Sequence, residues 1–185
     1  MPLPLLYGFL IGLAQLVATL VVFFLGLHGS AEGLARAQKP ESIIGFVLLM
    51  ILLGLAHRTA KKASLARGET ELPLGGAAKL AALTALVAGL ATGAFQWLYA
   101  ALINPRLGEL QRAQVLERAA PDLAKLSPED AAAAMRQIES FTSPAARGVV
   151  FGINTFLFAL LLGIAYALIF RAAVRRDQKA GKPSA

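Results

Sequence analysis

Very few side chains in this sequence could carry out chemistry. The chain has no cysteine, which excludes a disulfide framework, a thiolate metal site and a cysteine nucleophile. Its two histidines, His28 and His57, flank different apolar segments, so we expect neither a histidine pair nor a histidine-rich metal site. Glu32 follows His28 closely and could form an acid–base pair with it, but catalysis also needs a nucleophile and an orienting group within reach. We therefore predict that the protein is not an enzyme and has no catalytic residue, metal site or cofactor.

The remaining candidates are uncharged polar side chains inside long apolar segments. They are Gln15, Thr19, Thr84, Thr92, Gln96, Asn154 and Thr155. At a helical rise of about 1.5 Å per residue, Gln15 falls near the middle of its segment. Gln96 and Asn154 each fall about 7 Å from the middle of theirs, toward the same end, where they could meet. Gln15, Gln96 and Asn154 could line a polar pocket for a lipid or a small polar ligand. The alternative, which we favour, is that these amides form interhelical hydrogen bonds that fix the helix register.

The chain has four long segments without Asp, Glu, Lys or Arg, at positions 3–27, 42–57, 80–103 and 148–170, and all of these polar residues lie in the first, third and fourth. Hydrophobic residues make up 57% of the chain and charged residues only 16%, against about 25% in a soluble domain. About 20 helical residues cross a bilayer, so three segments are long enough and the second is short. The sequence predicts an all-α integral membrane protein, one domain over residues 1–185 with four transmembrane helices.

The distribution of charge supports a membrane span at the second segment. Residues 58–79 and 171–185 together carry ten Lys or Arg and three Asp or Glu, which accounts for the whole net charge of +7. The other two connections, 28–41 and 104–147, carry eight basic and eight acidic residues together. If the second segment spans, both basic regions lie on the side that positive residues favour, the cytoplasm. We therefore expect a protein of the bacterial inner membrane with both termini and the basic tail 171–185 in the cytoplasm. Membrane lipid is then an expected partner, and nucleic acid is not.

A signal peptide is the alternative interpretation of the first segment. Small residues at Gly29 and Ala31 would suit a cleavage site. However, no Lys or Arg precedes the apolar run, and the run is longer than the 7–15 residues that are typical of a signal peptide. We therefore expect a transmembrane helix.

Residues 104–147 are too long for a plain loop and carry helix signals. Ser127 and Pro128 are typical of a helix start, and acidic residues follow them. From there Met135, Ile138 and Phe141 lie at helical spacing and form an apolar stripe. We expect an extracytoplasmic helical hairpin whose stripe is covered, either by the protein's own bundle, by the bilayer surface or by a protein partner. We favour the first two.

Small residues recur at every fourth position in three of the segments. They are Gly8 and Gly12 in the first, Ala77, Ala81, Ala85, Gly89 and Gly93 in and before the third, and Ala159, Gly163 and Ala167 in the fourth. In lipid, such residues let helix backbones approach closely. They could make a homo-oligomer, but we favour packing within one four-helix bundle, which has several interfaces of its own.

Three local motifs make the chain similar to a known family. They are Tyr7-Gly8 with Gly12, the run from Leu74 to Lys79 with Tyr99 and Ile103-Asn104-Pro105 after it, and Phe141-Thr142-Ser143-Pro144. The sequence resembles the bacterial membrane family DUF4199 over nearly its whole length. This resemblance implies four membrane helices and no activity.

Taken together, these features predict a non-catalytic binding or assembly module, an accessory subunit of an envelope complex. The alternative is a small transport or lipid-handling protein that acts as an oligomer.

Overall fold

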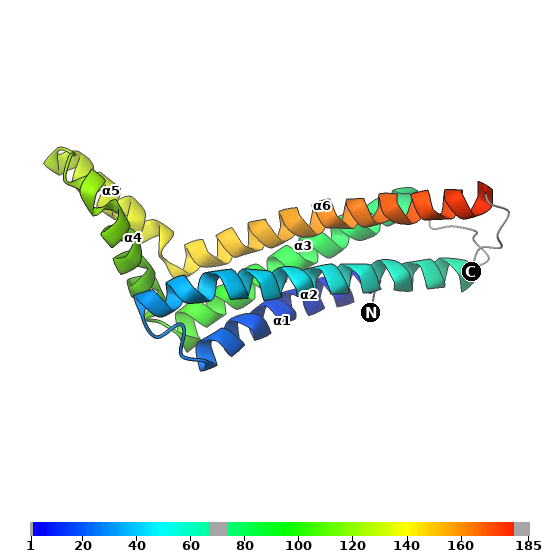
Figure 1. Cartoon of the computed structure of the whole chain (residues 1–185), viewed down its shortest axis with the longest axis horizontal. Helices are drawn as coiled ribbons and strands as arrows, with labels where there is room; N and C mark the ends of the chain where they lie inside the picture. The colour runs from blue at the N-terminus through cyan, green and yellow to red at the C-terminus, as the bar shows by residue number, and fades with distance from the viewer. Residues whose placement is uncertain (1, 67–73, 180–185) are drawn as a thin grey trace.

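The computed structural model describes the backbone of residues 2–66 and 74–179 and the side chains of 2–66 and 75–169. Four long helices run side by side, and two shorter ones project from one end of the bundle (Figure 1). The elements are α1 (Leu3–Phe24), α2 (Ala31–Ala66), α3 (Leu74–Leu98) with its π-helical continuation (Tyr99–Ile103), α4 (Leu107–Leu123), α5 (Pro128–Phe141) and α6 (Pro144–Lys179). We call the end that carries α4 and α5 the hairpin end.

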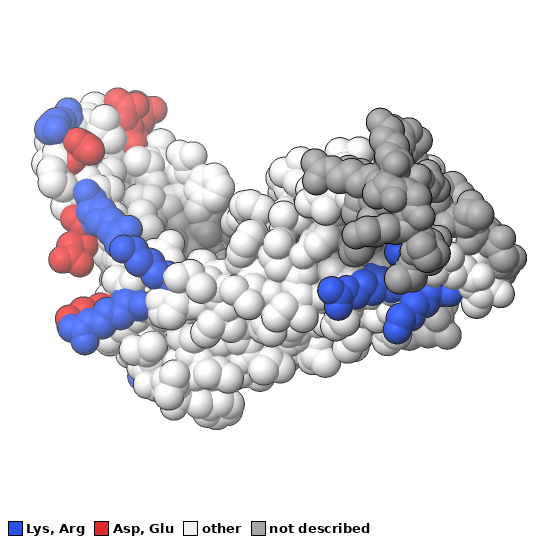
Figure 2. Space-filling model, turned by 45° about the vertical axis from the view of Figure 1, so that its right-hand side comes forward, with Lys and Arg blue, Asp and Glu red and all other residues white. Residues whose placement is uncertain are grey.

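All four long helices are long and apolar enough to cross a membrane. On the face in Figure 2, charged side chains of the described residues gather at the two ends of the molecule, with a wide uncharged band between them. This arrangement confirms the predicted all-α fold with four membrane helices and two shorter helices between the third and fourth. The protein is therefore a multi-pass membrane protein.

The helix α2 differs from the short span that the sequence suggested. It has 36 residues and continues through Pro40, so the uncharged segment 42–57 forms only its middle. The Ser30 side chain accepts a hydrogen bond from the backbone of Gly33 at its start, and Leu34 and Ala37 are buried against the bundle. The length of the uncharged segment underestimated the length of this helix. Before Glu41 only one face of the helix packs on the rest of the protein, so the other face can carry charged residues.

Glycines set the closest helix contacts. A Cβ at Gly8 or Gly12 would lie 2.6 Å from the Cβ of Val87 or 2.5 Å from the Cβ of Ala91, both on α3. Such distances leave no room for a side chain, so α1 and α3 touch through their backbones. Gly8 and Gly12, the predicted small residues of α1, therefore pack within the bundle.

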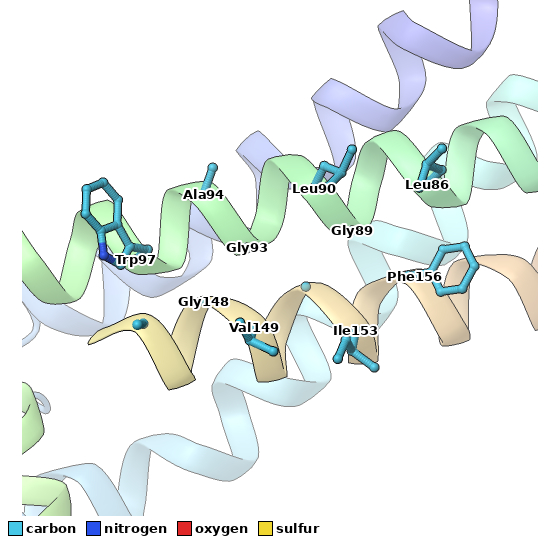
Figure 3. Close-up of a pocket in the computed structure, with 12 residues that line it drawn as sticks. Leu86, Gly89, Leu90, Gly93, Ala94, Trp97, Gly148, Val149, Ile153 and Phe156 are labelled. Carbon is cyan, nitrogen blue, oxygen red and sulfur yellow. The ribbon is translucent and has the colours of Figure 1, made fainter. Parts of the chain in front are cut away.

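The contact between α3 and α6 is built from glycines of both helices. A Cβ at Gly89 would lie 2.8 Å from the carbonyl oxygen of Gly152, and one at Gly93 would lie 2.9 Å from that of Gly148. Figure 3 shows the two helices side by side, with Gly89, Gly93 and Gly148 on their facing ribbons. The sequence prediction named Gly89 and Gly93 but missed Gly148, which follows directly after Arg147, and Gly152.

The two shorter helices form the predicted hairpin. The Ser127 hydroxyl accepts a hydrogen bond from the backbone of Asp130 at the start of α5, as expected of a helix cap. Arg112 of α4 forms an ion pair with Glu139 of α5 at 3.1 Å. No residue of α5 is buried, and Phe141 is 65% exposed. The bundle therefore does not cover the whole apolar stripe, because α5 packs mainly on α4 and reaches the bundle only at its end.

Candidate functional site

Polar side chains from every long helix meet at the hairpin end of the bundle. We call this set the polar network; it comprises Thr19 (α1), His28 (between α1 and α2), Glu41 (α2), Gln96 (α3), Tyr99, Asn104 and Arg147 (α6). All are buried except Glu41, whose side chain is 17% exposed. Buried polar groups are costly unless they are paired, so the partners of each member decide what the network can do.

Three different partners surround the carboxylate of Glu41. The Thr19 hydroxyl donates a hydrogen bond of 2.6 Å to Oε1. His28 Nε2 lies 3.4 Å from Oε2, and a terminal nitrogen of Arg147 lies 3.9 Å from Oε1. Both oxygens of this carboxylate are therefore turned toward the protein's own groups, and its charge is balanced by Arg147.

Arg147 contacts Gln96, Phe151 and Glu41. Its Nε donates to Gln96 Oε1 at 3.0 Å, and Gln96 in turn donates to the Thr19 hydroxyl at 2.8 Å. Its guanidinium lies over the ring of Phe151, 4.4 Å from the centroid. One terminal nitrogen, Nη2, is buried without a hydrogen-bond partner, and this is the atom that lies 3.9 Å from Oε1 of Glu41, too far for a hydrogen bond. Buried donors are nearly always satisfied, so an acceptor in addition to Glu41 is expected near this nitrogen.

A π-helical turn positions the other half of the network. The backbone N–H of Asn104 donates to the carbonyl of Tyr99 at 2.8 Å, the wide spacing that defines this turn. The Asn104 amide donates to the Tyr99 hydroxyl and to the His28 carbonyl, both at 3.3 Å. The Tyr99 hydroxyl lies 2.5 Å from His28 Nδ1. Because Tyr99 accepts from Asn104, its own proton is free to go to His28, which leaves the Nε2 proton of His28 facing Glu41.

A pocket of about 380 Å³ opens beside the network, between α2, α4 and the start of α6. Network members His28, Glu41 and Arg147 form part of its wall. The rest of the wall combines polar and apolar residues: Gln38, Gln111, Gln114, Arg118 and Thr142, and Leu34, Val115, Phe141, Ala146, Val150 and Phe151. Converging polar groups among apolar side chains are typical of a ligand site.

A second hollow lies along α3 and α6 within the membrane-spanning segments. It has a volume of about 580 Å³ and a floor of glycine backbone, with Trp97 and Phe156 in its walls (Figure 3). Every residue that lines it is apolar apart from the indole of Trp97. No group there could orient a polar ligand, so the pocket beside the polar network is the better candidate.

The structure separates the three polar residues that the sequence singled out. Gln96 is buried in the network and bonds to Thr19 and Arg147 rather than to Asn154. Asn154 is exposed on α6, so the prediction that these two amides meet is wrong. Gln15 donates to the backbone carbonyl of Gly45 at 2.8 Å, an interhelical hydrogen bond of the kind we favoured.

The predicted apolar stripe reaches the pocket only at its end. Met135 and Ile138 are half-buried on α5, whereas Phe141 lines the pocket wall. The stripe thus contributes one residue to the candidate site.

Sequence reasoning missed the charged half of the site. The sequence places Glu41 and Arg147 among the loop charges, and for His28 it offers only a surface pair with Glu32, which we set aside. A signal was present: His28, Glu41, Asn104 and Arg147 each stand directly beside the end of an uncharged segment. All four ends lie on the same side of the membrane in the predicted topology, so these residues could have been placed in one layer.

Comparison with known proteins gives a family for the chain. Neither the curated proteins nor the solved structures include a match. The family model described as "Protein of unknown function (DUF4199)" matches residues 6–176, which contain the polar network and nearly all of the four membrane helices. The chain therefore belongs to the DUF4199 family, as its motifs predicted.

Proposed function

We propose that this protein is a non-catalytic binding module of the bacterial inner membrane. In this proposal both termini are cytoplasmic, and the hairpin end faces the extracytoplasmic side. The excess of Lys and Arg in residues 58–79 and 171–185 supports this orientation. The pocket between α2, α4 and α6 would then take its ligand from the outer side of the membrane.

The observation that carries the proposal is the contact between the pocket and the polar network. Arg147 belongs to the pocket wall, and its Nη2 has no hydrogen bond and only a long ion pair with Glu41, in a network that is otherwise well satisfied. Binding is favoured over catalysis because the Tyr99 hydroxyl is fully buried and Glu41 is held by Thr19 and His28. A group that exchanges protons with a substrate must be free to reach it, whereas the Tyr99 hydroxyl is buried and both oxygens of Glu41 already face groups of the protein.

Two roles fit a binding module of this kind. The projecting hairpin, with no residue of α5 buried, supports an accessory subunit of an envelope complex. The position of the pocket at the end of the membrane-spanning helices supports the alternative, a lipid-handling protein that acts as an oligomer. Identification of what co-purifies separates the two roles.

Two neighbouring alanines allow a matched test of the pocket. Ala146 lines the pocket, whereas the adjacent Ala145 lines the apolar hollow on the other side of α6. The full chain and its Ala146→Trp and Ala145→Trp variants would be purified in mild detergent, and co-purifying lipids and proteins would be identified by mass spectrometry. We expect Ala146→Trp to lose a ligand that wild type and Ala145→Trp retain. Equal ligand content in all three proteins would contradict the proposal.

A further inference from the structure

We propose that the pocket binds an anionic lipid headgroup that carries hydroxyl groups, a phosphoglycerol being the simplest example. This inference rests on the proposed binding function and names the class of its ligand. Four features support this description. They are the charges of the pocket, the guanidinium of Arg147, the glutamines of α2 and α4, and the position of the pocket.

The charge of the pocket favours an anion. Its wall contains two permanent cations, Arg118 of α4 and Arg147 of α6, and one acid, Glu41. These three side chains give the pocket a net charge of +1. The two oxygens of Glu41 also face Thr19 and His28. The first turn of α6 also belongs to the wall, and the positive end of a helix dipole stabilises a nearby anion.

The guanidinium of Arg147 suits a phosphate oxygen. Arg147 is 8% exposed, its Nε is used by Gln96, and its Nη2 has no hydrogen bond and only a long ion pair with Glu41 at 3.9 Å. The ring of Phe151 and the Gln96 amide fix the plane of the guanidinium, so little freedom would be lost when an oxygen binds. Guanidinium groups bind phosphate through such fixed N–H donors.

Hydroxyl groups and a lipid chain account for the rest of the wall. Gln38, Gln111 and Gln114 each present an amide that both donates and accepts, which is what a polyol needs. A volume of about 380 Å³ holds a headgroup but not a whole lipid. The acyl chains would therefore extend out of the pocket past apolar residues such as Phe141 and Val150. The pocket lies at the end of membrane-spanning helices, where headgroups are found.

A binding assay with water-soluble probes tests the inference. The purified full chain in detergent would be titrated with dihexanoyl phosphatidylglycerol, dihexanoyl phosphatidylcholine and glycerol phosphate, with heat as the readout. We expect phosphatidylglycerol to bind about tenfold more tightly than phosphatidylcholine, the gain of one hydrogen bond to a charged group. Weak binding of glycerol phosphate identifies the lipid as the ligand. Binding of glycerol phosphate as tight as that of the lipid would identify a free phosphate ester instead.

Charge variants of α4 give the matched control. Arg118 is exposed at the pocket wall, and Arg106 is exposed just before α4 and away from the pocket. Arg118→Gln and Arg106→Gln remove the same charge from the same end of the protein. We expect Arg118→Gln to weaken phosphatidylglycerol binding about tenfold and Arg106→Gln to leave it unchanged. Arg147→Gln should abolish the preference for phosphatidylglycerol, but the Arg118 pair decides the matter if that variant does not fold.

Failure of this inference is distinguishable from failure of the proposed function. Equal affinity for phosphatidylglycerol and phosphatidylcholine, or an Arg118→Gln variant that binds as wild type does, overturns the anionic ligand. If Ala146→Trp still removes a neutral ligand in that case, the binding module stands. If Ala146→Trp removes nothing and no probe binds, both proposals fall.

Discussion

The side chains that distinguish this protein are charged groups placed where membrane helices end. Glu41 and Arg147 approach each other from α2 and α6, each beside a long apolar segment. Removing a charge from water is expensive, and a nearby opposite charge with hydrogen bonds offsets that cost. The charge of Glu41 therefore allows Arg147 to be buried in the bundle, where we propose that it binds a ligand.

Loss of the Glu41 charge should destabilise the fold. In Glu41→Gln the buried Arg147 guanidinium has no carboxylate nearby, and we expect the free energy of unfolding in detergent to fall by about 1–3 kcal/mol. Glu32→Gln is the control, because Glu32 pairs with Arg36 at the surface, where such a pair contributes about 0.5 kcal/mol or less. Similar losses in the two variants would show that the Glu41–Arg147 pair is not important for stability.

The Tyr99 hydroxyl should matter more than that of Tyr7. In Tyr99→Phe, His28 Nδ1 loses its partner and the Asn104 amide loses one of two, both in a buried site. We expect a loss of about 1–3 kcal/mol in the free energy of unfolding. Tyr7→Phe removes a bond of 2.9 Å to Thr59, whose hydroxyl still donates to the Leu55 carbonyl, so its effect should be smaller. Thermal unfolding of both variants in the same detergent measures the difference. An equal loss would contradict the special importance of the Tyr99 hydroxyl.

Only some residues of the site could be predicted from the sequence. Gln96 was named because an amide inside an apolar segment stands out. Its partners, Thr19 and Arg147, lie 77 and 51 positions away, and no local pattern indicates which distant helix faces it. Asn154 was misplaced for the same reason: depth in the membrane follows from counting residues, but the direction of a side chain around the helix depends on packing.

At the scale of the helices, the sequence was informative about number and order and less so about length. Uncharged segments located all four membrane helices, and the helix start at Ser127-Pro128 located α5. The extension of α2 before residue 42 was missed, since its polar residues alternate with buried Leu34 and Ala37. Helix ends depend on tertiary contacts that charge alone does not reveal.

The glycine contact between α3 and α6 should tolerate no side chain. In Gly89→Ala the new Cβ would lie 2.8 Å from both the Gly152 carbonyl oxygen and the Cβ of Phe156. We expect a loss of about 1–3 kcal/mol in the free energy of unfolding of the monomer. Gly54→Ala is the control in another membrane helix, because its nearest neighbour, the Tyr166 hydroxyl, lies 3.6 Å away. If Gly89→Ala changed only the dimer content at constant monomer stability, the contact would not be an internal one.

For the whole molecule, the position of the pocket depends on which way the bundle crosses the membrane. The N-terminal end of α1 and the C-terminal end of α6 both lie on the side of the bundle away from the hairpin (Figure 1). A ligand from the outer leaflet reaches the pocket only if the hairpin end faces outward. The orientation is therefore a requirement of the proposed function as well as a consequence of the charge distribution.

Reporter fusions test this orientation directly. We expect reporters fused after Lys62 and after Lys179 to indicate the cytoplasm, and reporters fused after Lys39 and after Lys125 to indicate the outside. The pair Lys39 and Lys62 brackets the uncharged middle of α2, so opposite signals there require this helix to cross the bilayer. The pair Lys125 and Lys179 brackets α6 in the same way and serves as the control for a long, unambiguous span.

A cytoplasmic signal after Lys125 would mean that the excess of basic residues does not set the orientation, and the pocket would then meet headgroups of the inner leaflet. Matching signals after Lys39 and Lys62 would mean that α2 does not cross, which would remove Glu41 from the outer end and with it the counter-charge of Arg147.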